Sequence, residues 1–313
     1  MFENSAALAR SITWNGSKQS YFTNRFLVDK ALETDCYRAY AYFRWVDDVI
    51  DIYSETRDER ISFIKRQKRL INLLYENVRP EGLSPEEEII ADLINHDKGV
   101  NSGLQSFIRN FLAVIEFDAY RKGRLINEQD LNWYSSILGK SVTDAIQYFI
   151  KNGYPYPDGN NRYLAATAAH ITHMLRDLAE DINEGYFNIP LEYLDDHEIS
   201  LDDLNNPLFR AWVRERVKLA RKYFRLGKIY LDGLDVLRCK LAGYWYCARF
   251  ESVLDKIEQN NYLINNFQSK HNEFFLILKM ILLGVTITIQ HFSEKILRIF
   301  VNLPTTRAWR RQR

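Results

Sequence analysis

Apolar residues recur at three- and four-residue spacing along most of the chain, and this period predicts helices. The seven prolines are confined to the joints between these stretches, so long tracts remain free of helix breakers. No segment alternates apolar and polar residues as a half-buried strand does, and no repeat or linker divides the chain. The fold class predicted is therefore all-α, with helices expected over 34–52, 57–77, 86–96, 103–121, 128–150, 161–184, 208–232 and 236–267.

The C-terminal region has a different pattern. Residues 274–289, FFLILKMILLGVTITI, are apolar apart from Lys279, and a basic tail, RAWRRQR, ends the chain. The run is shorter than the ~20 residues that a membrane-spanning helix needs. Three alternatives fit it: a last core helix, a helix in the membrane interface, or a tilted anchor. We favour membrane contact, because arginines and a tryptophan beside an apolar helix suit an anionic membrane surface.

The composition excludes few classes of function, but it bears on the partners and the cellular location expected for the protein. The 42 basic and 41 acidic side chains nearly cancel, so no nucleic-acid partner is expected. The aromatic share of 14% fits either a bulky core or a cavity for a greasy or cationic guest. The N-terminus lacks the apolar segment of a signal peptide, and the cysteines form no C-x-x-C pair. Both observations favour a cytoplasmic protein, which would be membrane-associated if the C-terminal segment binds lipid.

The first candidate for chemistry is YFRWVDDVID, residues 42–51. Asp47 and Asp51 are four residues apart, so a helix places their carboxylates on one face. Two carboxylates at this spacing repel each other unless a cation lies between them. The alternatives are a metal site and a solvated helix end with Arg44 as a partner.

A second acidic stripe lies in HITHMLRDLAEDINEGYFNIP, residues 170–190. His173, Asp177 and Asp181 follow one another at four-residue spacing, with Arg176 and Glu180 beside them. Two such helices facing each other would place carboxylates on opposite walls of a cavity. Mg²⁺ typically takes one or two carboxylates and completes its shell with substrate phosphate.

The chemistry predicted for such a cavity is departure of a diphosphate. Mg²⁺ neutralises the charge that builds on the departing oxygen. If the carbon side is an allylic isoprenoid, a carbocation remains, which an aromatic, water-poor cavity stabilises.

These motifs resemble those of the squalene/phytoene synthase family, from about Ser20 to about Tyr262. YFRWVDDVID and LRDLAEDINEGYFNIP resemble its two aspartate-rich motifs, and VLDKIEQNNY resembles its late helix. The segment at Ser20, Tyr21 and Phe22 resembles an N-terminal element that contacts substrate diphosphate. Tyr134 lies where the family carries a tyrosine in its central helix.

The resemblance implies an isoprenoid-synthase helical bundle around a central active-site cavity. It implies that two molecules of farnesyl or geranylgeranyl diphosphate are joined head-to-head through a cyclopropyl diphosphate. The product would be phytoene, dehydrosqualene or, with NADPH, squalene. We accordingly divide the chain into a catalytic domain, 1–272, and a membrane-associating C-terminal segment, 273–313.

The site residues expected on this basis fall into three groups. The catalytic residues are Asp47, Asp51, Asp177, Asp181 and Tyr134. The metal ligands, for Mg²⁺ or Mn²⁺, are Asp47, Asp51, His173, Asp177 and Asp181. The substrate-binding residues are Ser20, Tyr21, Phe22, Arg44, Arg176 and Lys140.

Three departures from the family pattern bear on the product. His170 and His173 replace a usual Gln and Asn, Lys140 replaces a small residue in LGKSVT, and Phe267 replaces a late arginine. Imidazole is a better ligand for borderline metals than for Mg²⁺, which prefers oxygen ligands. His173 therefore has three alternative roles: a metal ligand, a hydrogen-bond donor to diphosphate, or a group that orients Asp177.

Two other functions stay open. A terpene cyclase or diphosphate lyase would ionise one prenyl diphosphate without coupling it to another. An inert, membrane-associated scaffold would reuse the fold, but it would have no need for paired carboxylates facing a cavity.

Overall fold

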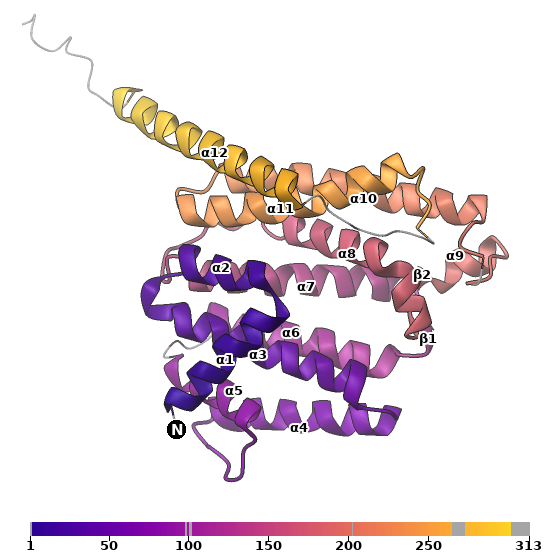
Figure 1. The fold of residues 1–313 in the computed structure, drawn as a ribbon, viewed down its shortest axis with the longest axis horizontal. Coiled ribbons are helices and arrows are strands. Elements are labelled where there is room, and N and C mark those ends of the chain that lie inside the picture. The colour runs from indigo at the N-terminus through magenta and orange to yellow at the C-terminus, as the bar shows by residue number, and fades with distance from the viewer. Residues whose placement is uncertain (1, 98, 100–101, 202, 265–272, 302–313) are drawn as a thin grey trace, which may run out of the picture.

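The computed structural model describes residues 2–97, 99, 102–201, 203–264 and 273–301, and Phe267 and the basic tail lie outside these ranges. The described residues form a stack of helical layers (Figure 1). The helices are α1 (Phe2–Gly16), α2 (Lys18–Leu27), η1 (Lys30–Leu32), α3 (Glu33–Asp48), η2 (Val49–Tyr53), α4 (Arg57–Tyr75), α5 (Pro85–His96), α6 (Gly103–Arg121), α7 (Glu128–Phe149), α8 (Leu164–Asn183), α9 (Leu191–Asp196), α10 (Pro207–Asp232), α11 (Leu237–Gln259) and α12 (Glu273–Val301).

Local signals in the sequence set where most helices begin. Thr56 and Glu59 form a reciprocal capping box at the start of α4, and Ser84 and Glu87 form another at α5, where Pro85 takes the first helical position. Each box satisfies backbone N–H groups that have no partner within the helix. The predicted helices agree with the structure to within three residues when α3 and η2 are taken together, except that the last one was predicted to end at 267 whereas α11 ends at Gln259. Residues 265–267 of that prediction lie outside the described ranges.

The pair α1 and α2 was not predicted. The buried face of α1 consists of small and polar residues, Ser5, Ala9 and Thr13, which pack against α3 and α5. Ser5 Oγ donates to Asp92 Oδ2 at 2.6 Å, and Thr13 Oγ1 donates to the Ala9 carbonyl at 2.8 Å. The larger apolar residues of the helix are only partly buried, so its fully buried positions give no clear apolar period, and this is why the pattern missed it.

Two short strands also differ from the expectation of helices alone. β1 (Arg124–Ile126) pairs in parallel with β2 (Tyr186–Pro190), directly after α6 and α8. Gly123 and Gly185 adopt positive φ angles of 79° and 87° at the two helix ends, and Gly123 N–H donates to the Gly185 carbonyl at 2.7 Å. The pair thereby fastens the C-terminal ends of α6 and α8 to each other.

Helix α8, which carries the second acidic stripe, lies between α7 on one side and α10 and α11 on the other (Figure 1). Its apolar face is buried, with Ile171, Leu175 and Leu178 at most 2% exposed. A Cβ atom on Gly139 of α7 would lie 2.2 Å from Thr167 Oγ1, so only glycine permits this close approach of α7 to α8. Helix α8 is thus held in place from several sides.

Helix α12 contacts α11 and then projects beyond the rest of the molecule (Figure 1). Trp245 Nε1 of α11 donates to the Met280 carbonyl at 2.8 Å. The helix covers the predicted apolar run and extends past it to Val301. The division of the chain at residue 272 stays a prediction.

Candidate active site

The first acidic motif lies where α3 ends. Asp47 occupies the last α-helical turn, and Asp51 lies in the π-helical turn η2 that continues it. Such turns are rare and often mark functional sites. Asp51 accepts a hydrogen bond from the Tyr186 hydroxyl, and its carbonyl accepts one from Lys122 Nζ at 3.0 Å. The π-turn is therefore tied to the segments that follow α6 and α8.

Arg44 does not pair with either of these carboxylates. Its Nη2 atom donates to Asp48 Oδ1 at 2.6 Å, in an i,i+4 pair whose arginine is 44% exposed. The solvated ion pair considered from the sequence thus exists, but Asp48 makes it. Asp47 and Asp51 are left to face the interior.

The sequence reasoning missed an aspartate that lies between the two motifs. Asp118 of α6 interacts electrostatically with Asp51 and Asp47 on one side and with Asp181 on the other. It accepts hydrogen bonds from Arg121 Nε at 2.7 Å and from the Tyr134 hydroxyl at 2.9 Å. An acid within the apolar run FLAVIEFDAY, three residues before an arginine, was the signal available in the sequence.

Arg121 connects this central carboxylate to the second motif. Its Nη1 atom donates to Asn188 Oδ1 at 2.9 Å, and Asn188 Nδ2 donates to Asp181 Oδ2 at 2.7 Å. Arg121 is 6% exposed, and its guanidinium lies 4.7 and 4.9 Å from the ring centroids of Tyr134 and Tyr186. The two acidic motifs thus belong to one buried network.

Tyr134, predicted from the resemblance, is part of this network. Its ring lies edge-on to His170 of α8, with 4.7 Å between centroids. Burial and the neighbouring Asp118 carboxylate hold the pKa of Tyr134 well above its usual range, so its hydroxyl stays a hydrogen-bond donor.

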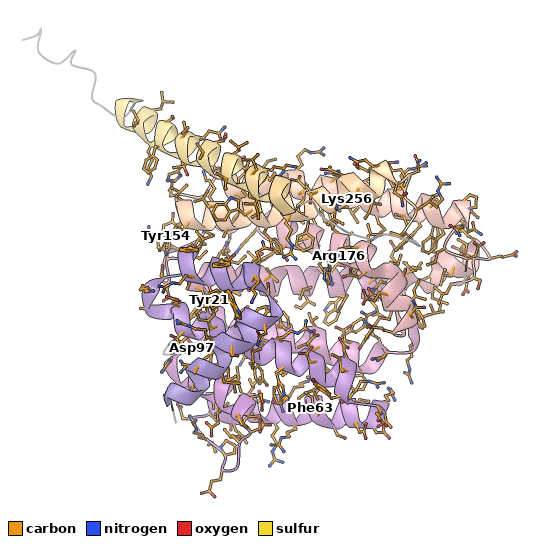
Figure 2. The ribbon with its side chains drawn as sticks, viewed as in Figure 1. Tyr21, Phe63, Asp97, Tyr154, Arg176 and Lys256 are labelled. Atoms are coloured by element: carbon orange, nitrogen blue, oxygen red, sulfur yellow. The ribbon has the colours of Figure 1, made fainter. Side chains whose placement is uncertain are left out.

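The second motif holds its first aspartate in a local ion pair. Arg176 Nε and Nη2 reach the two oxygens of Asp177 at 2.6 and 2.5 Å, and His173 Nε2 lies 3.2 Å from Asp177 Oδ2. Figure 2 shows Arg176 among the side chains that fill the space between the helical layers. The stripe of His173, Asp177 and Asp181 is therefore real, with Arg176 neutralising its centre.

Both acidic motifs contain a carboxyl group that binds protons unusually strongly. Burial, followed by the charges of Asp51 and Asp118, raises the pKa of Asp47 to about 7. Burial, followed by Asp177, raises the pKa of Asp181 to about 7. Opposed carboxylates thus carry negative charge that the surrounding protein does not fully compensate.

This excess charge predicts that Asp47→Asn stabilises the metal-free protein as pH rises. The folded-state pKa of Asp47 lies above its ordinary value of 3.8, so the free energy of unfolding falls as pH rises from about 4 to about 7 and the loss is complete above that range. We expect similar unfolding free energies for variant and wild type at about pH 4, near the ordinary pKa, and a gain on the order of 2–4 kcal/mol for the variant at pH 8. Urea unfolding in EDTA measures this difference, and equal stabilities at pH 8 would contradict it.

The two histidines of α8 are held neutral. Burial lowers the pKa of His170 well below its ordinary value, and its Nδ1 atom has no hydrogen-bond partner among the described groups. Desolvation, followed by Arg176, lowers the pKa of His173 to about 4, although half of the His173 side chain is exposed. Desolvation and the two arginines, Arg176 and Arg249, therefore outweigh the nearby Asp177 carboxylate, which alone would raise the pKa of His173.

The N-terminal element reaches α11 rather than the aspartates. Gln19 of α2 accepts a hydrogen bond from Arg249 Nη1, and Arg249 interacts electrostatically with Arg176 and His173. The predicted substrate contacts on α2 have structural partners: Ser20 N–H donates to Ser17 Oγ at 3.1 Å, Tyr21 packs on Trp14 and Tyr37, and Phe22, which is 47% exposed, stacks on Phe26. Arg249 is a further cation near the second motif that the sequence did not indicate.

Lys140 lies away from the network. It is half-buried and stands about 120° around α7 from Tyr134 at 100° per residue. Its predicted role in substrate binding stays a prediction.

Two surface hollows of about 530 and 520 Å³ lie near residues 96–103, and neither is lined by the acidic residues described above. Among the described residues, no group of three or more His, Cys, Asp or Glu side chains forms a ready-made ion site. The donors nevertheless fit Mg²⁺, because this ion takes only one or two carboxylates and keeps phosphate or water oxygens in its shell. The raised pKa values of Asp47 and Asp181 indicate where a divalent cation would relieve repulsion.

Comparison with known proteins identifies the class. A family model described as squalene/phytoene synthase matches residues 15–273. A 15-cis-phytoene synthase of Synechocystis sp. is 23% identical over 285 residues, covering 84% of this chain and 80% of its own. A phytoene synthase of Thermus thermophilus is 29% identical over 99 residues, which cover 30% of this chain and 34% of that protein.

Solved structures show the same fold at low identity. A squalene synthase, HpnC, from Alicyclobacillus acidocaldarius superposes with a TM-score of 0.64 at 18% identity, covering 82% of this chain and 94% of its own. A dehydrosqualene synthase in complex with ligand gives 0.70 at 17% identity, covering 93% and 98%. The chain belongs to the squalene/phytoene synthase family, whose members are transferases of isoprenoid biosynthesis that act on prenyl diphosphates. The predicted fold class and family are thereby confirmed.

Proposed function

We propose that this protein joins two prenyl diphosphates head-to-head, with Mg²⁺-assisted departure of diphosphate and a cyclopropyl diphosphate intermediate. One observation carries the proposal: Asp118, Arg121 and Asn188 lead by hydrogen bonds to Asp181 of the second motif. Tyr186, whose ring lies 4.9 Å from the Arg121 guanidinium, donates its hydroxyl to Asp51 of the first motif, so one cluster connects both motifs. A site for two diphosphates needs two metal-binding walls in fixed relation, and this network supplies that relation.

Four aspartates and one arginine would bind the metal and the diphosphates. Asp47 and Asp51 on one wall, and Asp177 and Asp181 on the other, would hold Mg²⁺ against the diphosphates. The bound metal supplies charge neutralisation for the leaving group. Arg176 would exchange its pairing with Asp177 for a substrate phosphate, since guanidinium binds both groups in the same bidentate manner.

The aromatic residues would stabilise the carbocation that remains after diphosphate departs. Tyr134 and Tyr186 are buried, and their rings already face the Arg121 cation at under 5 Å. Rings in this orientation stabilise positive charge and keep water away from it.

A single-substrate cyclase or lyase is the second candidate. Its support is His170, a buried ring beside Tyr134 where the family pattern has a glutamine. Such a change alters the cavity while retaining the ionising aspartates.

Product analysis separates these functions. The protein is incubated with Mg²⁺ and farnesyl or geranylgeranyl diphosphate, with and without NADPH, and the extracts are examined by mass spectrometry. Coupling yields a C30 or C40 hydrocarbon, and an NADPH-dependent change from dehydrosqualene to squalene reveals reduction. A C15 or C20 product supports the cyclase or lyase, and absence of diphosphate release supports the scaffold.

We expect His173→Asn to reduce activity with Mn²⁺ relative to Mg²⁺ by roughly 10-fold, because an oxygen donor favours Mg²⁺. Since the pKa of His173 is about 4, wild type and variant should share the same pH profile above pH 5. Initial rates with each metal between pH 5 and 8 test both points, with His197→Asn, at the residue that follows α9, as a distant control. An unchanged metal ratio with weaker binding of both metals would show that His173 only orients Asp177.

A further inference from the structure

Helix α12 is fixed to the protein along one side. Ile287 and His291 are 3% and 5% exposed, and Gly284 lies against the indole of Trp245. With the Trp245–Met280 hydrogen bond, these contacts define the face that packs on α11. The remaining circumference of the helix is available to solvent.

A second face of α12 consists mainly of large apolar side chains that the described structure leaves uncovered, with Thr288 and Lys295 at one edge. At 100° per residue they fall within an arc of about 140°, next to the face that packs on α11. Each is 42–60% exposed: Ile277, Leu278, Ile281, Leu282, Val285, Ile289, Phe292 and Ile296. We call these eight residues the apolar stripe.

A third face of α12 is mostly polar. It borders the apolar stripe on the edge opposite to the face that packs on α11. Lys279, Thr286, Gln290 and Ser293 lie on it and are exposed, with Leu297 as the one exposed apolar residue described on this face. Soluble monomers rarely expose a contiguous apolar surface of this kind without a partner. The helix is therefore built with separate faces for docking, for an apolar partner and for water.

The charge of the chain indicates what that partner is. The last 19 residues, from Lys295 onward, contain six basic and no acidic side chains, whereas the whole chain has a net charge of only +1. Positive charge is thus concentrated where the stripe ends. A basic segment next to an amphipathic helix gains about 1 kcal/mol per Lys or Arg at an anionic lipid surface. A second copy of the chain would instead bring an equally basic segment to the same place.

We propose that α12 binds in the plane of an anionic membrane surface, with the apolar stripe inserted among the lipids and the basic C-terminus on the headgroups. The segment 277–297 is long and apolar enough to cross a membrane. Crossing would, however, carry Lys279, Glu294 and Lys295 into the bilayer and strip Ile287, His291 and the Met280 carbonyl from α11. Binding in the plane keeps every contact with α11 and hides only the stripe.

Flotation of the full chain with lipid vesicles tests the proposal. We expect binding to phosphatidylcholine vesicles that contain phosphatidylglycerol, weaker binding without it, and a decrease between 0.1 and 1 M salt as the charges are screened. Val285→Asp with Ile289→Asp places two charges in the stripe and should weaken binding at least about 10-fold. The matched control, Thr286→Asp with Gln290→Asp, adds the same charge to the polar face and should bind within a few-fold of wild type.

Four results would overturn the inference. The first is equal vesicle binding by the two double variants, and the second is no binding by wild type. Resistance to alkaline extraction from membranes would show a spanning helix instead. A dimer in light scattering that Val285→Asp with Ile289→Asp dissociates would show that a second copy covers the stripe. Diphosphate release with short, soluble prenyl diphosphates should be equal in both double variants, which keeps this test separate from that of the proposed function.

Discussion

Replacing either Asp47 or Asp177 with alanine should lower the rate of diphosphate release by on the order of 10³-fold. Each substitution removes one proposed metal ligand, and charge neutralisation by a metal is worth several kcal/mol, where every 1.36 kcal/mol is tenfold in rate. The double variant should be little slower than either single variant, because the two walls act on one reaction. Steady-state release of diphosphate, followed by a coupled assay at saturating Mg²⁺, measures all three.

The neighbouring carboxylate provides the control. Asp48 is paired with the exposed Arg44 at 2.6 Å, so Asp48→Ala should cost less than about tenfold. Thermal unfolding distinguishes loss of chemistry from loss of fold, because Asp47→Ala removes a carboxylate whose ionisation opposes folding and should not lower Tm at pH 8. Near-wild-type release in Asp47→Ala or Asp177→Ala would refute the metal-cluster hypothesis.

The sequence predicted the helices that bury large apolar residues, and it predicted both aspartate motifs. Four-residue spacing is a local property, so the stripe His173, Asp177 and Asp181 could be derived from α8 alone. The helix α1 could not, because Ser5, Ala9 and Thr13 pack through small size and hydrogen bonds rather than through an apolar period.

The elements that join the two motifs depend on contacts between distant segments. Asp118 and Asn188 are 70 residues apart in the chain, and the pairing of β1 with β2 brings the ends of α6 and α8 together. Local propensity carries no information about such a pairing. The sequence alone also did not show that Arg44 pairs with Asp48, because this pairing depends on which side of α3 faces solvent.

The pKa of His173 shows how burial can reverse an inference from neighbours. Sequence spacing places two carboxylates near the imidazole, which alone would raise its pKa. Desolvation is the largest cause that lowers the pKa to about 4, followed by Arg176 on the same helix and, more weakly, by Arg249 of α11. Burial, which follows from the tertiary structure, therefore decides the protonation state of this residue.

The central role given to Arg121 leads to a large expected effect on stability. Arg121→Met leaves the buried Asp118 carboxylate without its guanidinium and removes the link to Asn188. Breaking a buried ion pair on one side typically costs about 3–5 kcal/mol, because an uncompensated charge remains. We expect a loss of this size in the free energy of unfolding at pH 8, measured by urea denaturation.

Two further variants show whether Asp118 is the cause. The double variant Arg121→Met with Asp118→Asn removes both charges and should recover part of the loss, giving a coupling energy from the double-mutant cycle. Burial raises the pKa of Asp118, so acidification should also shrink the cost of Arg121→Met as that carboxyl group takes up a proton.

Arg124→Met, on the exposed start of β1, is the matched control and should stay within about 0.5 kcal/mol of wild type. If the double variant is no more stable than Arg121→Met at pH 8, the ion pair does not hold the two acidic walls together, and packing of the guanidinium on Tyr134 and Tyr186 must do so instead.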